Sequence, residues 1–142
     1  MGIKVEFILH GDDFPVYELA SELKIQNPIL ETKGQVRYIG ANSMEKRVSE
    51  CTSLMYETDY IDTIDVDVPL NSIYTAIVPN VHKIKKYIDK YQLSAKFVIV
   101  INLSENPIMS LSPKFIHLAN ELCAEVEFDS YIKQKSKMLW WK

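Results

Sequence analysis

Glycine is scarce in this sequence, and basic residues are not in excess. The 142 residues include four glycines and no glycine-rich loop of the kind that holds phosphates, which argues against a polyphosphate-binding site. Sixteen lysines and arginines stand against nineteen aspartates and glutamates, for a formal net charge of −3. Because a nucleic-acid-binding domain normally carries a basic excess, we expect no nucleic-acid partner.

Motifs for metal binding and nucleophilic catalysis are also absent. Cys51 and Cys123 are far apart in the sequence and form no CxxC pair, so we expect two buried free thiols and no disulfide. The three histidines, His10, His82 and His117, show no HxH or HExxH spacing, and no glycine-flanked serine marks a nucleophile elbow. We therefore expect no catalytic residues, no metal ion and no cofactor.

Long apolar runs are missing as well. No stretch approaches the roughly 18 apolar residues needed to span a membrane. The first residues lack both the charged lead and the small-residue cleavage site of a signal peptide. These features predict a cytoplasmic protein without a membrane partner.

Alternation of apolar and polar residues predicts several strands. Residues 3–11 place every second side chain on one apolar face, and residues 125–132 alternate in the same way. Residues 95–103 are apolar on both faces in their middle, which is typical of a central strand covered on both sides. Residues 33–42 predict a short strand between turns.

Helical spacing accounts for most of the remaining segments. Residues 16–23 follow the i, i+3, i+4, i+7 pattern after Pro15, which suits a first helical turn. Residues 69–92 carry a longer helical pattern that Pro79 interrupts, so we expect a kink or two short helices there. Ser112 predicts the cap of a third helix.

Together these elements predict one α+β domain over residues 1–133, followed by a lysine- and tryptophan-containing tail over residues 134–142. We expect a largely antiparallel or mixed sheet of five to six strands with two to three helices packed on it. The order strand, helix, two strands, helix, strand is ferredoxin-like in outline, and a C-terminal helix and strand extend it.

Several stretches resemble one bacterial family, known only as domain of unknown function 4279. The resemblance covers about residues 3–133, and the matching stretches are "VEFILHGDDFPVYELASELKI", "TKGQ", "SLMYET", "DVPLNSIYTAIVPNVHKIKKY" and "FVIVINLSENPIMSLSPKFIHLANELCAEVEFDSYI". The resemblance implies a small, stand-alone α+β bacterial protein. It brings no established activity and no catalytic residues to transfer.

The most concentrated charge lies in "TDYIDTIDVDVP", residues 58–69. Its four aspartates fit no EF-hand frame, because the ligand positions fall on apolar residues. Period-two spacing instead places Asp59, Asp65 and Asp67 on one face of a half-buried strand and leaves Asp62 on the other. A strand over residues 50–68 would be too long, so we expect a bend or bulge near Asp62.

This acidic face has two interpretations, a solvated strand face that also supplies helix caps, or a docking surface for a basic protein. Residues 50–67 contain six acids and no base, and a surface of one sign attracts partners of the other. The candidate protein-binding residues are Glu57, Asp59, Asp65, Asp67, Trp140 and Trp141. The two tryptophans are included because tryptophan is enriched in interface hot spots.

The leading hypothesis is a non-enzymatic protein-binding module, and neutralisation of a toxin by an immunity-like protein is one concrete version. One alternative is a small-molecule-binding protein or hydrolase with a pocket between sheet and helices, lined by His10, Asp12, Asp13 or Cys51. The other alternative is a homodimeric structural protein joined through an edge strand or the tail.

Overall fold

The computed structural model describes residues 1–131, so the predicted tail contacts Trp140 and Trp141 lie outside the described residues. In chain order the elements are β1 (Gly2–Gly11), α1 (Val16–Glu22), β2 (Ile29–Glu31), β3 (Val36–Ile39), β4 (Glu45–Val48), β5 (Thr52–Glu57), α2 (Asp67–Ile77), the 3-10 helix η1 (Val78–Asn80), α3 (Val81–Tyr91), β6 (Ser94–Asn102), α4 (Pro113–Glu121) and β7 (Glu125–Ser130).

Five of the strands form one mixed sheet in the order β2-β5-β1-β6-β7. The pairs β2–β5, β5–β1 and β1–β6 are antiparallel, and β6–β7 is parallel. The chain passes through α1 between β1 and β2, and through α2 and α3 between β5 and β6, which is the ferredoxin-like arrangement that the sequence predicted. The predicted C-terminal helix and strand are α4 and β7.

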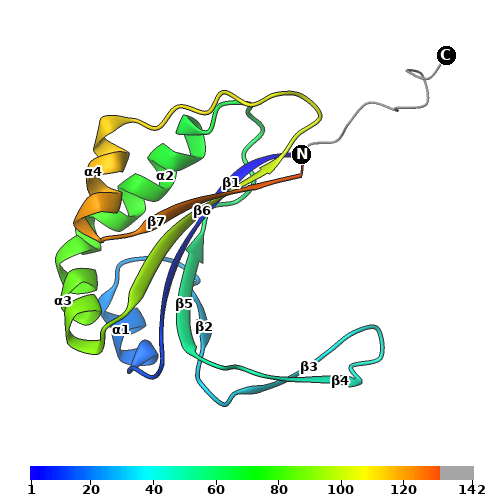
Figure 1. Ribbon diagram of the computed structural model, residues 1–142, viewed down its shortest axis with the longest axis vertical. Helices are drawn as coiled ribbons and strands as arrows, with labels where there is room; N and C mark the ends of the chain where they lie inside the picture. Colours follow the sequence, from blue (N-terminus) through cyan, green and yellow to red (C-terminus); the bar gives the residue numbers. More distant parts are fainter. Residues whose placement is uncertain (132–142) are drawn as a thin grey trace.

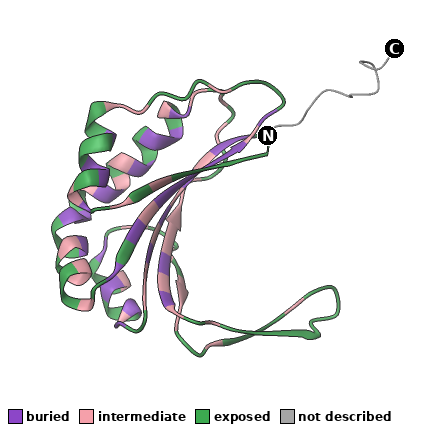
Figure 2. Ribbon diagram, in the orientation of Figure 1, coloured by how far each residue is buried: buried purple, intermediate pink, exposed green. Residues whose placement is uncertain are grey.

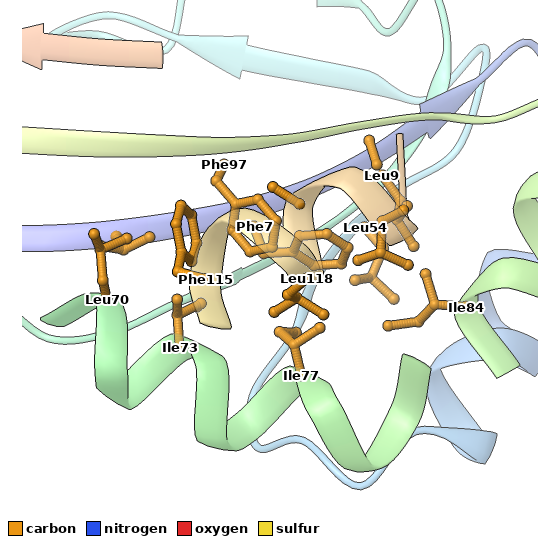
Figure 3. Close-up of a cluster of buried hydrophobic side chains, with 14 of the residues drawn as sticks. Phe7, Leu9, Leu54, Leu70, Ile73, Ile77, Ile84, Phe97, Phe115 and Leu118 are labelled. Carbon is orange, nitrogen blue, oxygen red and sulfur yellow. The ribbon is translucent and has the colours of Figure 1, made fainter. Parts of the chain in front are cut away.

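The helices all pack on one face of this sheet (Figure 1), and the buried residues concentrate between the two layers (Figure 2). The alternation of β1 explains the arrangement, since its odd-numbered apolar residues point into the helices and are fully buried. Phe97 lies at the centre, with its ring centroid 4.9 Å from that of Phe7 and 5.0 Å from that of Phe115 (Figure 3). The apolar face of α2, with Ile73 and Ile77, packs against this group.

The break predicted at Pro79 separates α2 from α3 through η1. Asn80, only 2% exposed, fixes the geometry of this junction. Its side-chain amide donates to the carbonyl oxygen of Ala76 at 3.0 Å, and its side-chain oxygen accepts from the Lys24 N–H at 2.9 Å. A buried amide that satisfies both of its hydrogen-bonding ends connects the helical break to the segment after α1.

The hairpin β3–β4 leaves the sheet on the side away from the helices (Figure 1). We call residues 33–49 the arm. It continues the β2–β5 hairpin, because the Gly34 N–H donates to the carbonyl oxygen of Ser49 at 2.8 Å and the Ser49 N–H donates to that of Gln35 at 2.9 Å. Figure 2 shows that the arm is exposed along almost its whole length. The short strand expected in residues 33–42 is therefore one half of a hairpin.

The two cysteines are free, but the expectation that both are buried is wrong. Cys51 is half-buried and Cys123 is exposed. Cys123 follows the end of α4 and adopts a positive φ of 50° in the turn into β7. This turn carries the residue off the apolar face of the helix, where continued helical spacing would have placed it.

Candidate functional site

The acidic segment of residues 58–69 does not form the continuous strand that the period-two spacing predicted. β5 ends at Glu57, and beyond it only Ile61 and Asp65 make isolated bridges. Between the pairs Glu6–Glu57 and Ile3–Ile61, three steps along β1 are opposed by four steps along the other segment, so one extra residue bulges out. The predicted bulge therefore lies just before Asp62.

The aspartates in and after this bulge are separated by local structure. Asp59 is exposed, whereas the Asp65 carboxylate accepts a hydrogen bond from the Asp67 N–H at 3.0 Å. Asp67 lies in the first turn of α2, where a negative charge is favourable. The prediction that Asp59, Asp65 and Asp67 share one strand face is wrong, because Asp65 shapes the start of a helix.

A different acidic surface forms on the side of the sheet that faces away from the helices. We call it the open face. Over β1, β5, β6 and β7 it carries the carboxylates of Glu6, Glu57, Glu125, Glu127 and Asp129 and the ammonium groups of Lys4 and Lys96. Glu31 of β2 lies on the same face, opposite Ser53, and forms an ion pair with Arg37. Register brings these side chains together, since Glu6 is opposite both Glu57 and Val98, and Val98 is opposite Glu127.

Lys4 lies among the carboxylates at the end of the open face that contains Glu57. Its Nζ is 3.0 Å from Glu57 Oε2, 3.5 Å from Glu6 Oε2 and 5.1 Å from the ring centroid of Tyr60. Burial acts to lower the pKa of Lys4, but the hydrogen bond and charge of Glu57, with the charge of Glu6, outweigh it and raise the pKa. Lys4 is therefore held in its charged form.

At Glu6, in contrast to Lys4, burial has a larger effect on the pKa than the neighbouring opposite charge. Burial raises the pKa of its carboxyl, and the neighbouring charge of Glu57 adds to that effect, while Lys4 offsets it only in part. The side chains of Lys4 and Glu6 are each 19% exposed. One ammonium group thus serves two carboxylates that lie directly opposite each other, an arrangement in which like charges repel.

The β7 side of the open face carries further negative charge. Lys96 Nζ lies 3.1 Å from Glu127 Oε2, whereas Glu125 and Asp129 make no ion pair with any residue that the structure describes. Asp129 accepts a hydrogen bond from the hydroxyl of Tyr131 at 3.2 Å, and this bond is the main cause of a raised Tyr131 pKa. Over β1, β5, β6 and β7, the open face therefore has five carboxylates and two ammonium groups.

Apolar side chains lie beneath these charges. Val98 and Val100 are only 7% and 4% exposed, although they point away from the helices and lie outside the helix-side core. Ile8 and Met55 pair across β1 and β5 on the same face and are half-buried. An apolar strip with a charged border resembles the organisation of protein interfaces.

Two hollows on the surface of residues 1–131 differ from the predicted pocket. One of about 370 Å³ includes His10, Lys96 and Cys123 in its lining, and one of about 460 Å³ beside β5 includes Glu57 and Asp59. Neither brings His10 together with Asp12, Asp13 or Cys51, and Asp12 instead pairs with Lys33 at 2.6 Å.

Residues 1–131 contain neither a metal-binding cluster nor a membrane-spanning helix. No group of three or more histidine, cysteine, aspartate or glutamate side chains in this range has a geometry that could hold a metal ion. In the same range, no helix has both the length and the apolar character required to cross a bilayer.

Sequence reasoning identified Glu57 but missed most of this surface. It placed Lys4, Glu6, Glu125, Glu127 and Asp129 on the polar sides of their strands, without joining those sides. The Lys4–Glu57 contact connects residues 53 positions apart, so it depends on which strands pair and in what register. Alternation within a single strand carries no such information.

These features define a small ferredoxin-like α+β protein whose sheet has one face covered by helices and one acidic face left open. The family model described as "Domain of unknown function (DUF4279)" matches residues 1–133, and the chain belongs to this family. The resemblance found in the sequence is thereby confirmed. No curated protein and no solved structure matches the chain.

Proposed function

We propose that this protein is a non-enzymatic protein-binding module and that its open face binds a basic segment of a partner. The observation that carries the proposal is the imbalance of five carboxylates against two ammonium groups over an apolar strip that no helix covers. The half-buried Ile8 and Met55 offer apolar contact to a partner, and the surrounding charge selects that partner.

The charges are expected to act more on the rate of association than on affinity. Exposed ion pairs contribute about 0.2–1 kcal/mol each, so the unpaired carboxylates of Glu125 and Asp129 add little individually. Together with Glu6, Glu57 and Glu127 they form a field of one sign, which accelerates encounter with a basic partner and weakens as salt is added.

Three other predicted residues belong to the proposal. Asp59 is exposed and lies beside Glu57 in the lining of one hollow, so it extends the acidic surface past the end of β5. Trp140 and Trp141, outside the described residues, are proposed as additional apolar contacts with the partner.

The biological setting proposed here is the bacterial cytoplasm. The free thiols of Cys51 and Cys123 suit a reducing compartment. Neutralisation of a basic toxin, in the manner of an immunity protein, is the concrete version of this function.

The experiment compares the wild type with the variant Glu125→Gln/Glu127→Gln/Asp129→Asn. Both immobilised proteins are exposed to bacterial lysate and, separately, to a synthetic peptide that alternates lysine and valine. Loss of three carboxylates is expected to weaken peptide binding about tenfold, at roughly 0.5 kcal/mol for each exposed pair. The set of captured lysate proteins should shrink in parallel.

A matched control carries the same change of charge away from the open face. Glu18→Gln/Asp89→Asn/Glu105→Gln alters three exposed carboxylates on α1, on α3 and in the loop after β6. This variant should bind as the wild type does. Equal binding by the wild type and the open-face variant would show that the carboxylates of β7 only keep an edge strand from pairing with other chains.

A further inference from the structure

The arm is basic and partly apolar. Residues 33–49 contain four bases, Lys33, Arg37, Lys46 and Arg47, against the single acid Glu45. Their exposed apolar side chains are Val36 at 44%, Tyr38 at 62%, Met44 at 83% and Val48 at 53%. A two-stranded hairpin without a packing partner is marginally stable in water. The composition therefore suits an element that is covered by another surface.

The cross-strand pairs of the arm support this conclusion. Arg37 is directly opposite Arg47, and like charges at such positions are destabilising. Arg37 forms an ion pair with Glu31 of β2, whereas Arg47 has Glu45 of its own strand at 3.7 Å. A dense group of carboxylates from elsewhere would relieve the repulsion.

The open face is the complementary surface on the same chain. We propose that the arm of one molecule binds the open face of a second copy, and that two copies exchange arms in a two-fold dimer. This inference rests on the proposed function of the open face and identifies the basic segment that binds there as the arm of a second copy. The arm supplies an excess of three positive charges, and the part of the open face formed by β1, β5, β6 and β7 supplies an excess of three negative ones.

The positions of the two surfaces suit two-fold symmetry. The arm leaves the sheet next to Thr52, which pairs with Gly11 at one end of β1, whereas Lys4 and the carboxylates around it lie toward the other end. The arm projects on the side away from the helices, which is also the side of the open face (Figure 1). A two-fold rotation therefore brings each arm to the carboxylate end of the other molecule, and both contacts form together.

The arm is also long enough for this contact. Residues 33–49 run out and back, so each half of the arm has about eight residues and reaches at most roughly 26 Å, at about 3.3 Å per residue. Five strands span four inter-strand spacings, or roughly 19 Å. The arm of one copy can therefore cross the sheet of the other.

The test is an exchange of charges followed by analytical ultracentrifugation. One variant reverses the arm, Arg37→Glu/Arg47→Glu, and another reverses the open face, Glu125→Lys/Asp129→Lys, while the ion pairs of Lys4 and Lys96 are kept. The wild type is expected to sediment at twice the monomer mass of 16.4 kDa. Each variant alone should sediment as a monomer.

Mixing the two variants should restore the dimer, because each arm then meets an open face of opposite charge. The chain that carries all four substitutions should also dimerise by itself. A control variant, Lys86→Glu/Lys90→Glu, reverses two exposed lysines of α3 and should keep the wild-type mass. Circular dichroism melts establish that each variant is folded, so loss of the dimer is not loss of the fold.

Three results would overturn the inference: a monomeric wild type at every concentration, variants that remain dimeric alone, or a mixture that stays monomeric. A monomeric wild type whose binding to the lysine–valine peptide still depends on Glu125, Glu127 and Asp129 would leave the proposed function standing and remove the dimer. A dimer insensitive to both charge reversals would place the contact at an edge strand or the tail.

Discussion

Adjacent residues of β1 serve two faces of one sheet that differ in chemistry. Val5 and Phe7 point into the helices and are fully buried, whereas Lys4 and Glu6 point to the open face and keep 19% of their side chains exposed. The helix side is held mainly by apolar contact. The open face combines an apolar strip with charges that neutralise each other only in part.

The two faces differ in whether their side chains still lack interaction partners. A core of aromatic and branched side chains is already complete, and its packing leaves nothing for a partner to add. On the open face, Val98 and Val100 are buried by the fold itself, but Glu125 and Asp129 lack a cationic partner among the described residues. A second molecule that carries basic residues could pair with these carboxylates.

The largest expected effect breaks the helix side. Phe97→Ala removes a fully buried ring that contacts Phe7 and Phe115, and it should lower the free energy of unfolding by about 3–5 kcal/mol. Val98→Ala, one residue along the strand, removes two methyl groups from the open face and should cost about 1–1.5 kcal/mol. Urea denaturation measures both, provided that the m-value is unchanged.

The two substitutions form a matched pair on neighbouring positions of β6. A Val98→Ala cost as large as that of Phe97→Ala would contradict the proposal. It would mean that the open face is covered by a packed layer, and such a layer would leave no room for a partner.

Breaking an ion pair of the open face should lower the free energy of unfolding less than Phe97→Ala does. The loss should also differ between the Lys4 end and the Lys96 end of this face. Lys4→Met leaves Glu6 and Glu57 opposed without their shared ammonium group and should cost about 1–2 kcal/mol at neutral pH. Lys96→Met breaks a more exposed pair, with side chains 31% and 50% exposed, and should cost about 0–1 kcal/mol.

A double-mutant cycle separates the charge of Lys4 from its packing. The variant Lys4→Met/Glu57→Gln removes the carboxylate that Lys4 bonds to most closely and should recover part of the loss. If the double variant were as unstable as the sum of the two single variants, the ammonium group would make no special contribution, and the Lys4 stem would matter instead.

Much of the fold could be predicted from local pattern, because the controlling interactions are local. Pro79 breaks the long helix, and Ser112 caps α4 by accepting a hydrogen bond from the Phe115 N–H at 3.4 Å. The arm was predicted only in part, since its exposed residues lack the alternation that a half-buried strand imposes. Register and exposure are properties of the assembled sheet.

The candidate site was harder to predict for the same reason. Period-two spacing in residues 58–68 matches a half-buried strand, yet the chain leaves β5 after Glu57 because of a bulge and an aspartate turn. The spacing of polar residues alone does not distinguish a bulge and a turn from a strand that continues to pair with its neighbour. Glu57 lies on the open face, but its charged neighbours Lys4 and Glu6 come from β1, and only tertiary pairing brings them together.

The smallest expected effect concerns the pH dependence of stability at Glu6. The folded protein raises the pKa of this carboxyl above its ordinary value of 4.5, so the folded chain holds the proton more tightly than the unfolded chain does. Its contribution to stability is therefore fully present below that value and is lost as the pH rises through the folded pKa. Glu6→Gln removes this dependence, and the wild type should lose stability relative to the variant between about pH 4 and neutrality. Urea titrations at a series of pH values measure the difference, and a difference that stays constant with pH would mean that Lys4 fully offsets the burial of Glu6.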